Sequence, residues 1–205
     1  MFKLSWDRCW LLIGAECSGE ELKSRLISAY SEPQRKYHTL QHLKECLAVF
    51  DRFVDLAQEK AEVEIALWFH DAIYDVKASD NERKSAEWAE IELTKAGVPL
   101  DRIKRIYNHI LATRHSALPL GRDQKLLVDI DLSILGSEPD RFNEYERQVR
   151  EEYSFVPDSI FHEKRREVLS RFLNRNQIYA TPELWGQFEV RARENIKGSI
   201  EALSG

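Results

Sequence analysis

The sequence has few glycines, prolines and cysteines and contains no long apolar run. Only 8 of its 205 residues are Gly and 6 are Pro, against a Gly usage of about 7% in average proteins. This shortage of chain breakers favours helices over a turn-rich β-sandwich. The three cysteines contain no Cys-x-x-Cys pair and leave one over, which argues against a disulfide framework and a thiolate zinc site and fits a reducing compartment. No stretch approaches the ~18 apolar residues of a membrane span.

Acidic and basic residues are nearly balanced, with 35 Asp and Glu against 30 Lys and Arg and a net charge of −5. Such a chain gains little from the phosphate electrostatics that drive nonspecific nucleic-acid binding, so we expect no specific nucleic-acid partner. Hydrophobic residues make up 43% of the chain, enough for a sizeable core, and the length fits one domain over residues 1–205. The apolar run at residues 10–15 is too short for a signal peptide. We therefore expect a cytoplasmic protein with no membrane partner.

Apolar residues recur with the period of an α-helix along most of the chain. Leu43, Leu47, Phe50 and Val54 form one such stripe at i, i+4, i+7 and i+11, and no segment shows the alternation of a strand. The last helix is expected to open at Thr181, which precedes a proline. The pattern predicts an all-α fold of about eight or nine helices. The other stripes contain Val63, Leu67, His70 and Tyr74; Ile103, Ile106, Tyr107 and Ile110; Phe142, Tyr145, Val149 and Tyr153; and Ile160, Phe161, Val168 and Leu169.

Polar residues interrupt three of the predicted helices. His70 and Asp71 lie within the apolar segment ALWFHDAIYD, Asp131 follows an apolar stripe, and His42 adjoins the start of another. A buried ionised carboxylate is costly unless it is paired or binds a metal. Imidazole and carboxylate are ordinary ligands of divalent transition metals, so one cation explains all four residues together. Each residue alone is better explained as a hydrogen-bonded core histidine or as an aspartate in a cap or ion pair; the combination favours a metal site.

The order of His42, then His70-Asp71, then Asp131 resembles the H…HD…D signature of the HD superfamily of metal-dependent phosphohydrolases. The surrounding segments are similar to those of a bacterial group described as predicted HD-superfamily phosphohydrolases, and they read YHTLQHL, ALWFHDAIYD, NERKSAEWAE, ILATRHS, VDIDLSILG and RREVLSRFLNRNQIYATPE. The resemblance covers residues 33–183, and a C-terminal helix at residues 182–203 is expected to pack on that core. It implies an HD-domain-like helical bundle with these four metal ligands between its helices.

The segment YHTLQHL also resembles the start of the cyclic-nucleotide phosphodiesterase site, another HD-fold family. There the first histidine lies at the catalytic face and the second binds the metal, which implies that His42 is a ligand and His38 a general acid. An i, i+4 pair can share one helix face, so the division is geometrically consistent. The segment DLSILG likewise favours Asp131 over Asp129 as the last ligand. Thr39 stands where that family commonly has Asn, which departs from specific cyclic-nucleotide chemistry.

The predicted ligand set suggests a hydrolytic reaction. We expect manganese, cobalt, nickel, iron, zinc or magnesium at the site, where the ion would polarise a phosphoryl group and lower the pKa of a water from about 15.7 toward ~7. Asp75 and Glu82 are candidates for the base that orients or deprotonates this water. Asp75 lies one helical turn after Asp71, whereas the position at which many HD phosphohydrolases carry a catalytic acid is Tyr74. Glu82 is equally explained by a helix capping box with Ser79.

The substrate phosphate requires cationic donors, and Lys36 and Arg114 lie nearest to the motifs, ahead of Arg35 and Arg83. The predicted function is therefore a metal-dependent phosphohydrolase acting on a small phosphorylated molecule such as a nucleotide. One alternative is an HD-fold dinuclear iron oxygenase, which needs additional histidine ligands, for which His109 and His115 are available. Another is a noncatalytic binding module stabilised by a metal.

Overall fold

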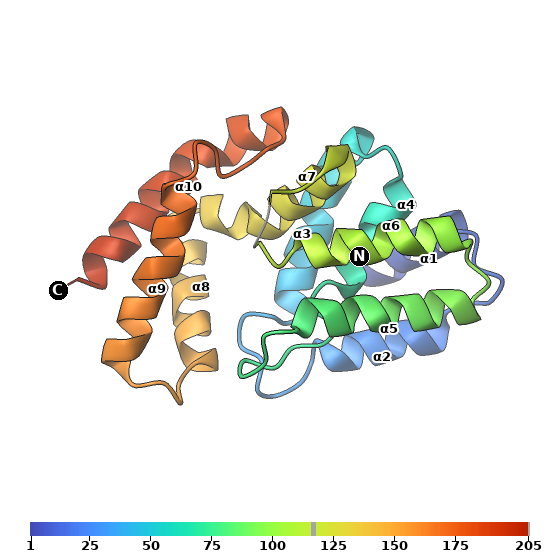
Figure 1. The fold of residues 1–205 in the computed structure, drawn as a ribbon, viewed down its shortest axis with the longest axis horizontal. Helices are drawn as coiled ribbons and strands as arrows, with labels where there is room; N and C mark the ends of the chain where they lie inside the picture. Colours follow the sequence, from blue (N-terminus) through green and yellow to red (C-terminus); the bar gives the residue numbers. More distant parts are fainter. Residues whose placement is uncertain (116–117, 205) are drawn as a thin grey trace. The chain divides into compact units, whose positions relative to one another are not determined.

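The computed structural model describes residues 1–115 and 118–204, and these residues form helices and connecting loops without a strand (Figure 1). The all-α prediction is confirmed, although the described ranges contain ten α-helices and two 3₁₀ helices where eight or nine helices were expected. Their bounds, in chain order, are α1 (Phe2–Leu12), α2 (Glu20–Ala29), α3 (Leu40–Phe53), η1 (Val54–Leu56), α4 (Lys60–Phe69), α5 (Asn81–Lys95), α6 (Leu100–Ala112), α7 (Gly121–Asp131), η2 (Leu132–Gly136), α8 (Pro139–Glu152), α9 (Asp158–Leu173) and α10 (Pro182–Ala202).

The chain divides into two compact units, Met1–Asp131 and Leu132–Gly205. The prediction of one domain over the whole chain stays a prediction, as does the packing of the C-terminal helix on the motif core. Within the second unit, α10 packs against η2 and α9. Among the described residues, no helix combines the length and the apolar character that a membrane crossing requires.

Helix α4 is the centre of the first unit. All its residues from Glu62 to Phe69 are buried, and it packs against α1, α3, α6 and α7. Two of these buried residues are acidic, and each is neutralised by an arginine of another helix: Arg105 Nε donates to Glu62 over 2.7 Å, and Arg8 Nε donates to Glu64 over 2.9 Å. Because α4 is surrounded by protein, its C-terminal end lies inside the unit. His70 and Asp71 directly follow α4 at this end.

Helix α3 confirms most of the stripe predicted from its sequence, since Leu43, Leu47 and Phe50 are buried together with His42, whereas Val54 is half-buried and starts η1. Thr39 is the N-cap of this helix, and its hydroxyl accepts a hydrogen bond from the amide of Gln41 at 3.2 Å. The helix therefore begins at Leu40. Capping by a threonine hydroxyl satisfies an amide that the first helical turn leaves without a partner.

Two other helix starts can be compared with their predictions. Thr181 is the N-cap of α10 and Pro182 occupies the first turn, as predicted. The capping box of Ser79 and Glu82 is wrong, because Asp80 is the N-cap of α5 and makes no side-chain capping bond. The next residue, Asn81, is tied instead to the backbone of the preceding loop.

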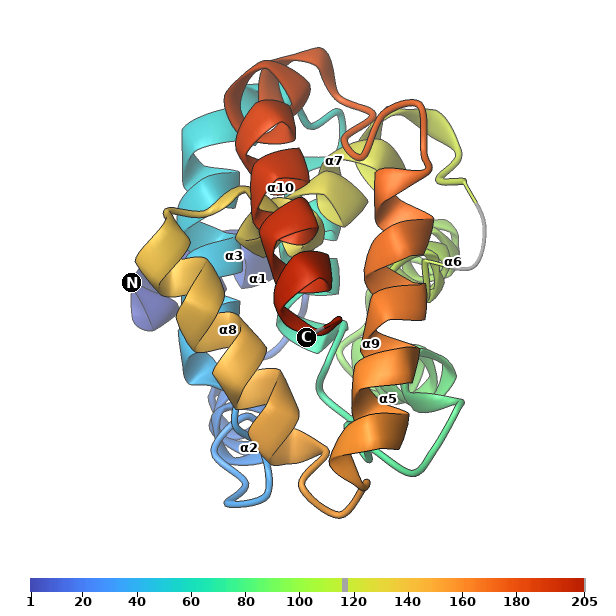
Figure 2. The same ribbon diagram turned by 90° about the vertical axis from the view of Figure 1, so that its left-hand side faces the viewer.

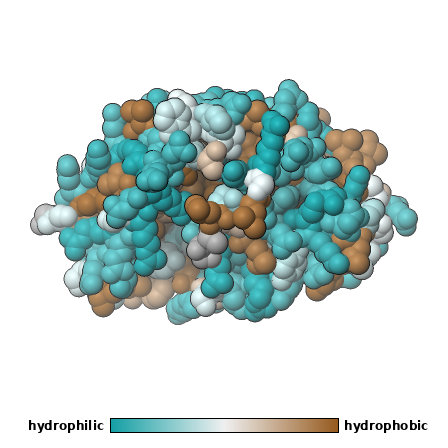
Figure 3. All heavy atoms as spheres, turned by 45° about the horizontal axis from the view of Figure 1, so that its top comes forward, coloured by the Kyte–Doolittle hydropathy of each residue, from teal (hydrophilic) through white to brown (hydrophobic). Residues whose placement is uncertain are grey.

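The second unit is built around η2, whose five residues are all buried. The Tyr179 hydroxyl donates to the carbonyl of Leu132 over 2.9 Å, and Gly136 lies so close to α10 that an added Cβ would be 2.7 Å from the backbone oxygen of Phe188. Glu146 of α8 accepts hydrogen bonds from Arg165 of α9 and Ser199 of α10, so one carboxylate joins three helices. The ribbons of α8, α9 and α10 can be followed in Figure 2. On the face drawn in Figure 3, hydrophilic residues predominate and hydrophobic ones are scattered among them.

Asp123 of α7 allows a stability test of the first unit. Its buried carboxylate accepts hydrogen bonds from the amides of Gln58 and Glu59, at 2.8 and 2.9 Å, just before α4. We expect Asp123→Ala to lower the free energy of unfolding by about 1–2 kcal/mol, because both amides lose their acceptor in a partly buried place. Urea denaturation monitored by circular dichroism measures this, with Glu90→Ala on the exposed side of α5 as the control. An equal stability of the two variants would contradict the capping role.

Candidate metal centre

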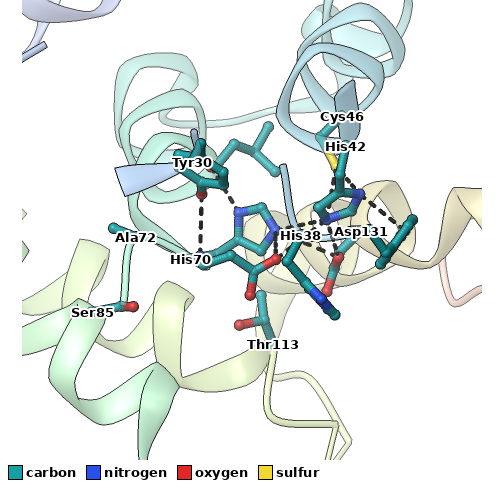
Figure 4. A network of polar contacts seen from close by, with 12 residues as sticks. Tyr30, His38, His42, Cys46, His70, Ala72, Ser85, Thr113 and Asp131 are labelled. Atoms are coloured by element: carbon teal, nitrogen blue, oxygen red, sulfur yellow. Dashed lines mark hydrogen bonds and ion pairs between the residues drawn. The ribbon is translucent and has the colours of Figure 1, made fainter. Parts of the chain in front are cut away.

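Two histidines and two aspartates from three segments converge in the first unit. His42 comes from α3, His70 and Asp71 directly follow α4, and Asp131 ends α7 (Figure 4). The Nε2 atoms of the two histidines lie 3.1 Å apart. Asp71 Oδ2 lies 3.4 Å from His42 Nε2 and 3.1 Å from His70 Nε2, and Asp131 Oδ1 lies 3.2 and 3.6 Å from the same two atoms. The structure therefore brings together all four predicted ligands.

These separations fit a shared cation. Metal–nitrogen and metal–oxygen bonds of about 2.1 Å put neighbouring ligand atoms about 3.0 Å apart at right angles and about 3.4 Å apart at tetrahedral angles. Four of the five separations around His42 and His70 are 3.1–3.4 Å and lie in this range, and the fifth, 3.6 Å between His70 Nε2 and Asp131 Oδ1, is slightly longer. The imidazoles are 2% and 1% exposed, whereas the Asp71 and Asp131 side chains keep 17% and 13% of their surface. An ion among them could thus be reached from solvent on the carboxylate side.

Each imidazole is oriented by a hydrogen bond at its other nitrogen. His70 Nδ1 lies 2.7 Å from the carbonyl of Leu67, which can only accept, so this nitrogen carries a proton, and in the neutral ring Nε2 presents its lone pair to the cluster. The Tyr37 hydroxyl lies 3.0 Å from His42 Nδ1, which leaves Nε2 of His42 facing the same way. Partners of this kind fix the ring orientation of metal-binding histidines.

The charges of the four groups are strongly coupled. Burial alone raises the pKa of Asp71 and Asp131, but the histidines around them lower it well below its ordinary value, so both carboxylates are ionised. Burial lowers the pKa of His42 and His70, and the surrounding groups, including these carboxylates, raise it well above its ordinary value. The cluster therefore attracts positive charge, which either protons or a cation can supply.

Cys46 is a cluster residue that the sequence interpretation missed. With His42, His70 and Asp131 it forms a group that could hold a metal ion. Its position four residues after His42, on the same helical stripe, was the signal available. Cys46 Sγ, however, lies 3.7 Å from both Nδ1 and Nε2 of His42. The sulfur is thus equally far from the two ring nitrogens of His42, whereas Asp71 Oδ2 lies 3.4 Å from Nε2, and both residues are candidates for the fourth ligand.

His38 and His115 lie next to the four ligands. The expectation that His38 shares a helix with His42 is wrong, because Thr39 caps α3 and leaves His38 in the preceding turn. Its ring centroid nevertheless lies 6.0 Å from that of His42 (Figure 4). His115, with a left-handed φ of 55°, places Nε2 3.0 Å from Asp131 Oδ2.

The two residues proposed as bases lie in different settings. Asp75 and Tyr74 belong to the loop between α4 and α5, since α4 ends at Phe69, so the helical spacing assumed for them is wrong. Asp75 is exposed, and its Oδ1 accepts from the amide of Lys77 at 2.9 Å. Glu82 lies half-buried in the first turn of α5. Among the described residues, neither makes a hydrogen bond or an ion pair with the four ligands, and their role as a base stays a prediction.

The basic residues considered for phosphate binding differ in their exposure and in their hydrogen-bond partners. Lys36 is exposed and donates to the carbonyl of Pro33 at 2.9 Å, and Arg114 is exposed in the turn after α6. Both remain predictions as substrate-binding residues. Arg35, considered with them, is 4% exposed and donates to the carbonyls of Asp71 and Ala72, so it holds the chain together instead of facing a substrate.

No protein-family model, no curated protein and no solved structure matches this chain.

The ligand set can be tested by the metal content of two matched variants. We expect Asp71→Ala to lose affinity for a divalent transition metal by about 10²-fold or more, because partners that merely orient a ligand already contribute about 10–100-fold. Cys46→Ala should keep the ion if Asp71 is the fourth ligand, since the Cys46 sulfur is no nearer to Nε2 than to Nδ1 of His42. Mass-spectrometric metal analysis and metal titration of both proteins measure this. Retention in Asp71→Ala with loss in Cys46→Ala would make the thiolate the fourth ligand.

Proposed function

We propose that this protein is a metal-dependent phosphohydrolase that cleaves a phosphoester of a small molecule such as a nucleotide. The observation that carries the proposal is the meeting of two oriented, buried imidazoles and two ionised carboxylates at the spacing of ligands to one cation. The ordered resemblance of the motifs around His42, His70-Asp71 and Asp131 to HD-superfamily phosphohydrolases supports the choice of reaction. The protein would act in the cytoplasm, as the cysteine usage suggests.

The donor set limits the metal. Two imidazole nitrogens and two carboxylate oxygens suit manganese, cobalt, nickel, iron or zinc, with magnesium as a further candidate, better than calcium, which takes oxygen ligands only. When bound, such an ion polarises the phosphoryl group and lowers the pKa of a coordinated water. The partly exposed carboxylates of Asp71 and Asp131 leave a side on which water and a phosphoryl oxygen can approach.

His38 is the residue that we assign to proton donation. As a water oxygen forms its bond to phosphorus and loses a proton to solvent, the ester P–O bond breaks and its electron pair leaves with the alcohol oxygen. The His38 imidazolium would protonate that oxygen, so a neutral alcohol departs. The His38 ring is half-buried and lies beside His42, but His38 is not part of α3. This position is consistent with a proton donor that is distinct from the metal ligand His42.

A dinuclear iron oxygenase is the second candidate, and one observation favours it. His115 Nε2 contacts the Asp131 oxygen that faces away from His42 and His70, so a third imidazole lies at the edge of the cluster. His109, the other histidine that the oxygenase would need, is buried on α6, and neither ring nitrogen has a hydrogen-bond partner among the described residues. Two equivalents of iron and consumption of oxygen would identify this function.

The proposed reaction is tested by a substrate screen. We expect the purified protein, supplied with manganese, cobalt, nickel or magnesium, to hydrolyse at least one ester of a panel of nucleotides and small phosphoesters. Chelation should abolish phosphate release and added metal should restore it, while Asp131→Ala should lower turnover by about 10²-fold or more because the ion loses a ligand. Phosphate release that persists after chelation and in Asp131→Ala would refute the proposal.

The division of roles between His38 and His42 is tested side by side. His38→Ala should keep its metal and lose about 10²–10⁴-fold in turnover, the usual contribution of a positioned general acid, whereas His42→Ala should lose both. The loss in His38→Ala should be larger for an alkyl phosphoester than for a 4-nitrophenyl ester, whose leaving group needs no proton. Wild-type turnover in His38→Ala would remove its catalytic role, and loss of metal would make it a ligand.

A further inference from the structure

The loop after Asp71 contains an aromatic side chain that contacts His38. The rings of His38 and Tyr74 are stacked, with centroids 4.0 Å apart and planes inclined by 25°. The ring centroids of Tyr37 and His42 lie farther from that of His38, at 4.8 and 6.0 Å, and their planes are inclined by 78° and 75°. A parallel contact at this distance restricts the orientation of an imidazole ring more than an edge contact does.

The backbone beneath this ring pair is held by one buried cation. Arg35 is 4% exposed, and its Nη1 donates to the carbonyl of His38 at 3.3 Å and to that of Asp71 at 2.6 Å, while Nη2 donates to the carbonyl of Ala72 at 3.0 Å. The planar guanidinium thereby links the turn that carries His38 to the loop that carries Asp71 and Tyr74. Its Cζ also lies 5.6 Å from the Tyr74 ring centroid.

These contacts matter because α3 does not hold His38. The helix starts at Leu40, so His38 lies outside it, and the residue is half-buried. A general acid must nevertheless stay within reach of the leaving oxygen, since a displacement of about 1 Å can cost about 10²-fold in rate. The stacked Tyr74 ring supplies the restriction that the helix does not.

We propose that Tyr74 is the positioning residue of His38: it holds the imidazole by stacking, on a backbone that Arg35 ties to the metal-binding loop. The catalytic part of this inference rests on the proposed function, because it takes His38 as the general acid. The stacked arrangement itself is a feature of the structure and does not depend on the proposed function.

The first test reads the position of the ring without any turnover. In the proton NMR spectrum of the full chain, we expect the His38 ring protons, assigned by their loss in His38→Ala, to lie upfield because of the Tyr74 ring current. Tyr74→Leu, which keeps a side chain of moderate size without a ring, should move them toward the position of an unstacked histidine. Tyr74→Phe should restore the upfield position. Unchanged resonances in Tyr74→Leu would overturn the positioning role.

The second test reads the consequence for catalysis. With an alkyl phosphoester found in the screen, Tyr74→Leu should lower kcat by about 10–10²-fold with KM and metal content unchanged, and Tyr74→Phe should recover most of the loss. The double variant His38→Ala/Tyr74→Leu should be no slower than His38→Ala, since both changes remove the same group. Additive losses, or a loss that Tyr74→Phe does not recover, would overturn the inference.

The two tests separate failure of the inference from failure of the proposed function. A wild-type protein without phosphoester turnover refutes the function and with it the catalytic part of the inference, while the ring resonances still decide whether Tyr74 holds His38. Turnover in the wild type with unshifted resonances in Tyr74→Leu keeps the function and refutes the positioning. Arg35 is left unchanged in both tests, because removing a buried cation from three carbonyls would endanger folding.

Discussion

The burial of opposite charges at one point is the constraint on which the first unit depends. His42, His70, Asp71 and Asp131 place two imidazoles and two carboxylates within a few ångströms of one another. Carboxylates are costly to bury alone, and their mutual repulsion must be offset by protons on the histidines or by a cation. Because the four groups come from α3, the end of α4 and the end of α7, whatever neutralises them also draws these three helices together.

The same rule applies to the other buried charges of this unit. Glu62 and Glu64, on a helix that is buried on all sides, each receive an arginine from another helix, and Asp123 receives two backbone amides. A buried ion pair adds little net stability compared with apolar packing, but removal of one partner leaves a charge without compensation. The pairs therefore mainly restrict how the other helices can be arranged around α4. In this way they also restrict where His70 and Asp71 lie at the C-terminal end of α4.

The histidines and the carboxylates of the cluster lie in different surroundings. The histidines are oriented by Tyr37 and by the carbonyl of Leu67, deep in the interior, whereas the carboxylates border the solvent. A site of this kind combines rigid ligands with an accessible side, which is the arrangement that hydrolysis at a metal ion requires. The backbone clamp of Arg35 extends the rigid part to the turn and loop beside the accessible side.

The sequence by itself determined the helical class, the buried stripe of α3 and the four residues that meet at the cluster. These features depend on periodicity and on the cost of placing charge among apolar residues, and both can be evaluated locally. The tertiary structure decided those features for which several groups compete for the same hydrogen-bond partner. The Thr39 hydroxyl accepts a hydrogen bond from the Gln41 amide, so α3 begins after His38. The carbonyls of the residues after α4 accept hydrogen bonds from Arg35, which the sequence had suggested as a phosphate-binding residue. Such choices follow from distances between segments far apart in the chain, which no local pattern contains.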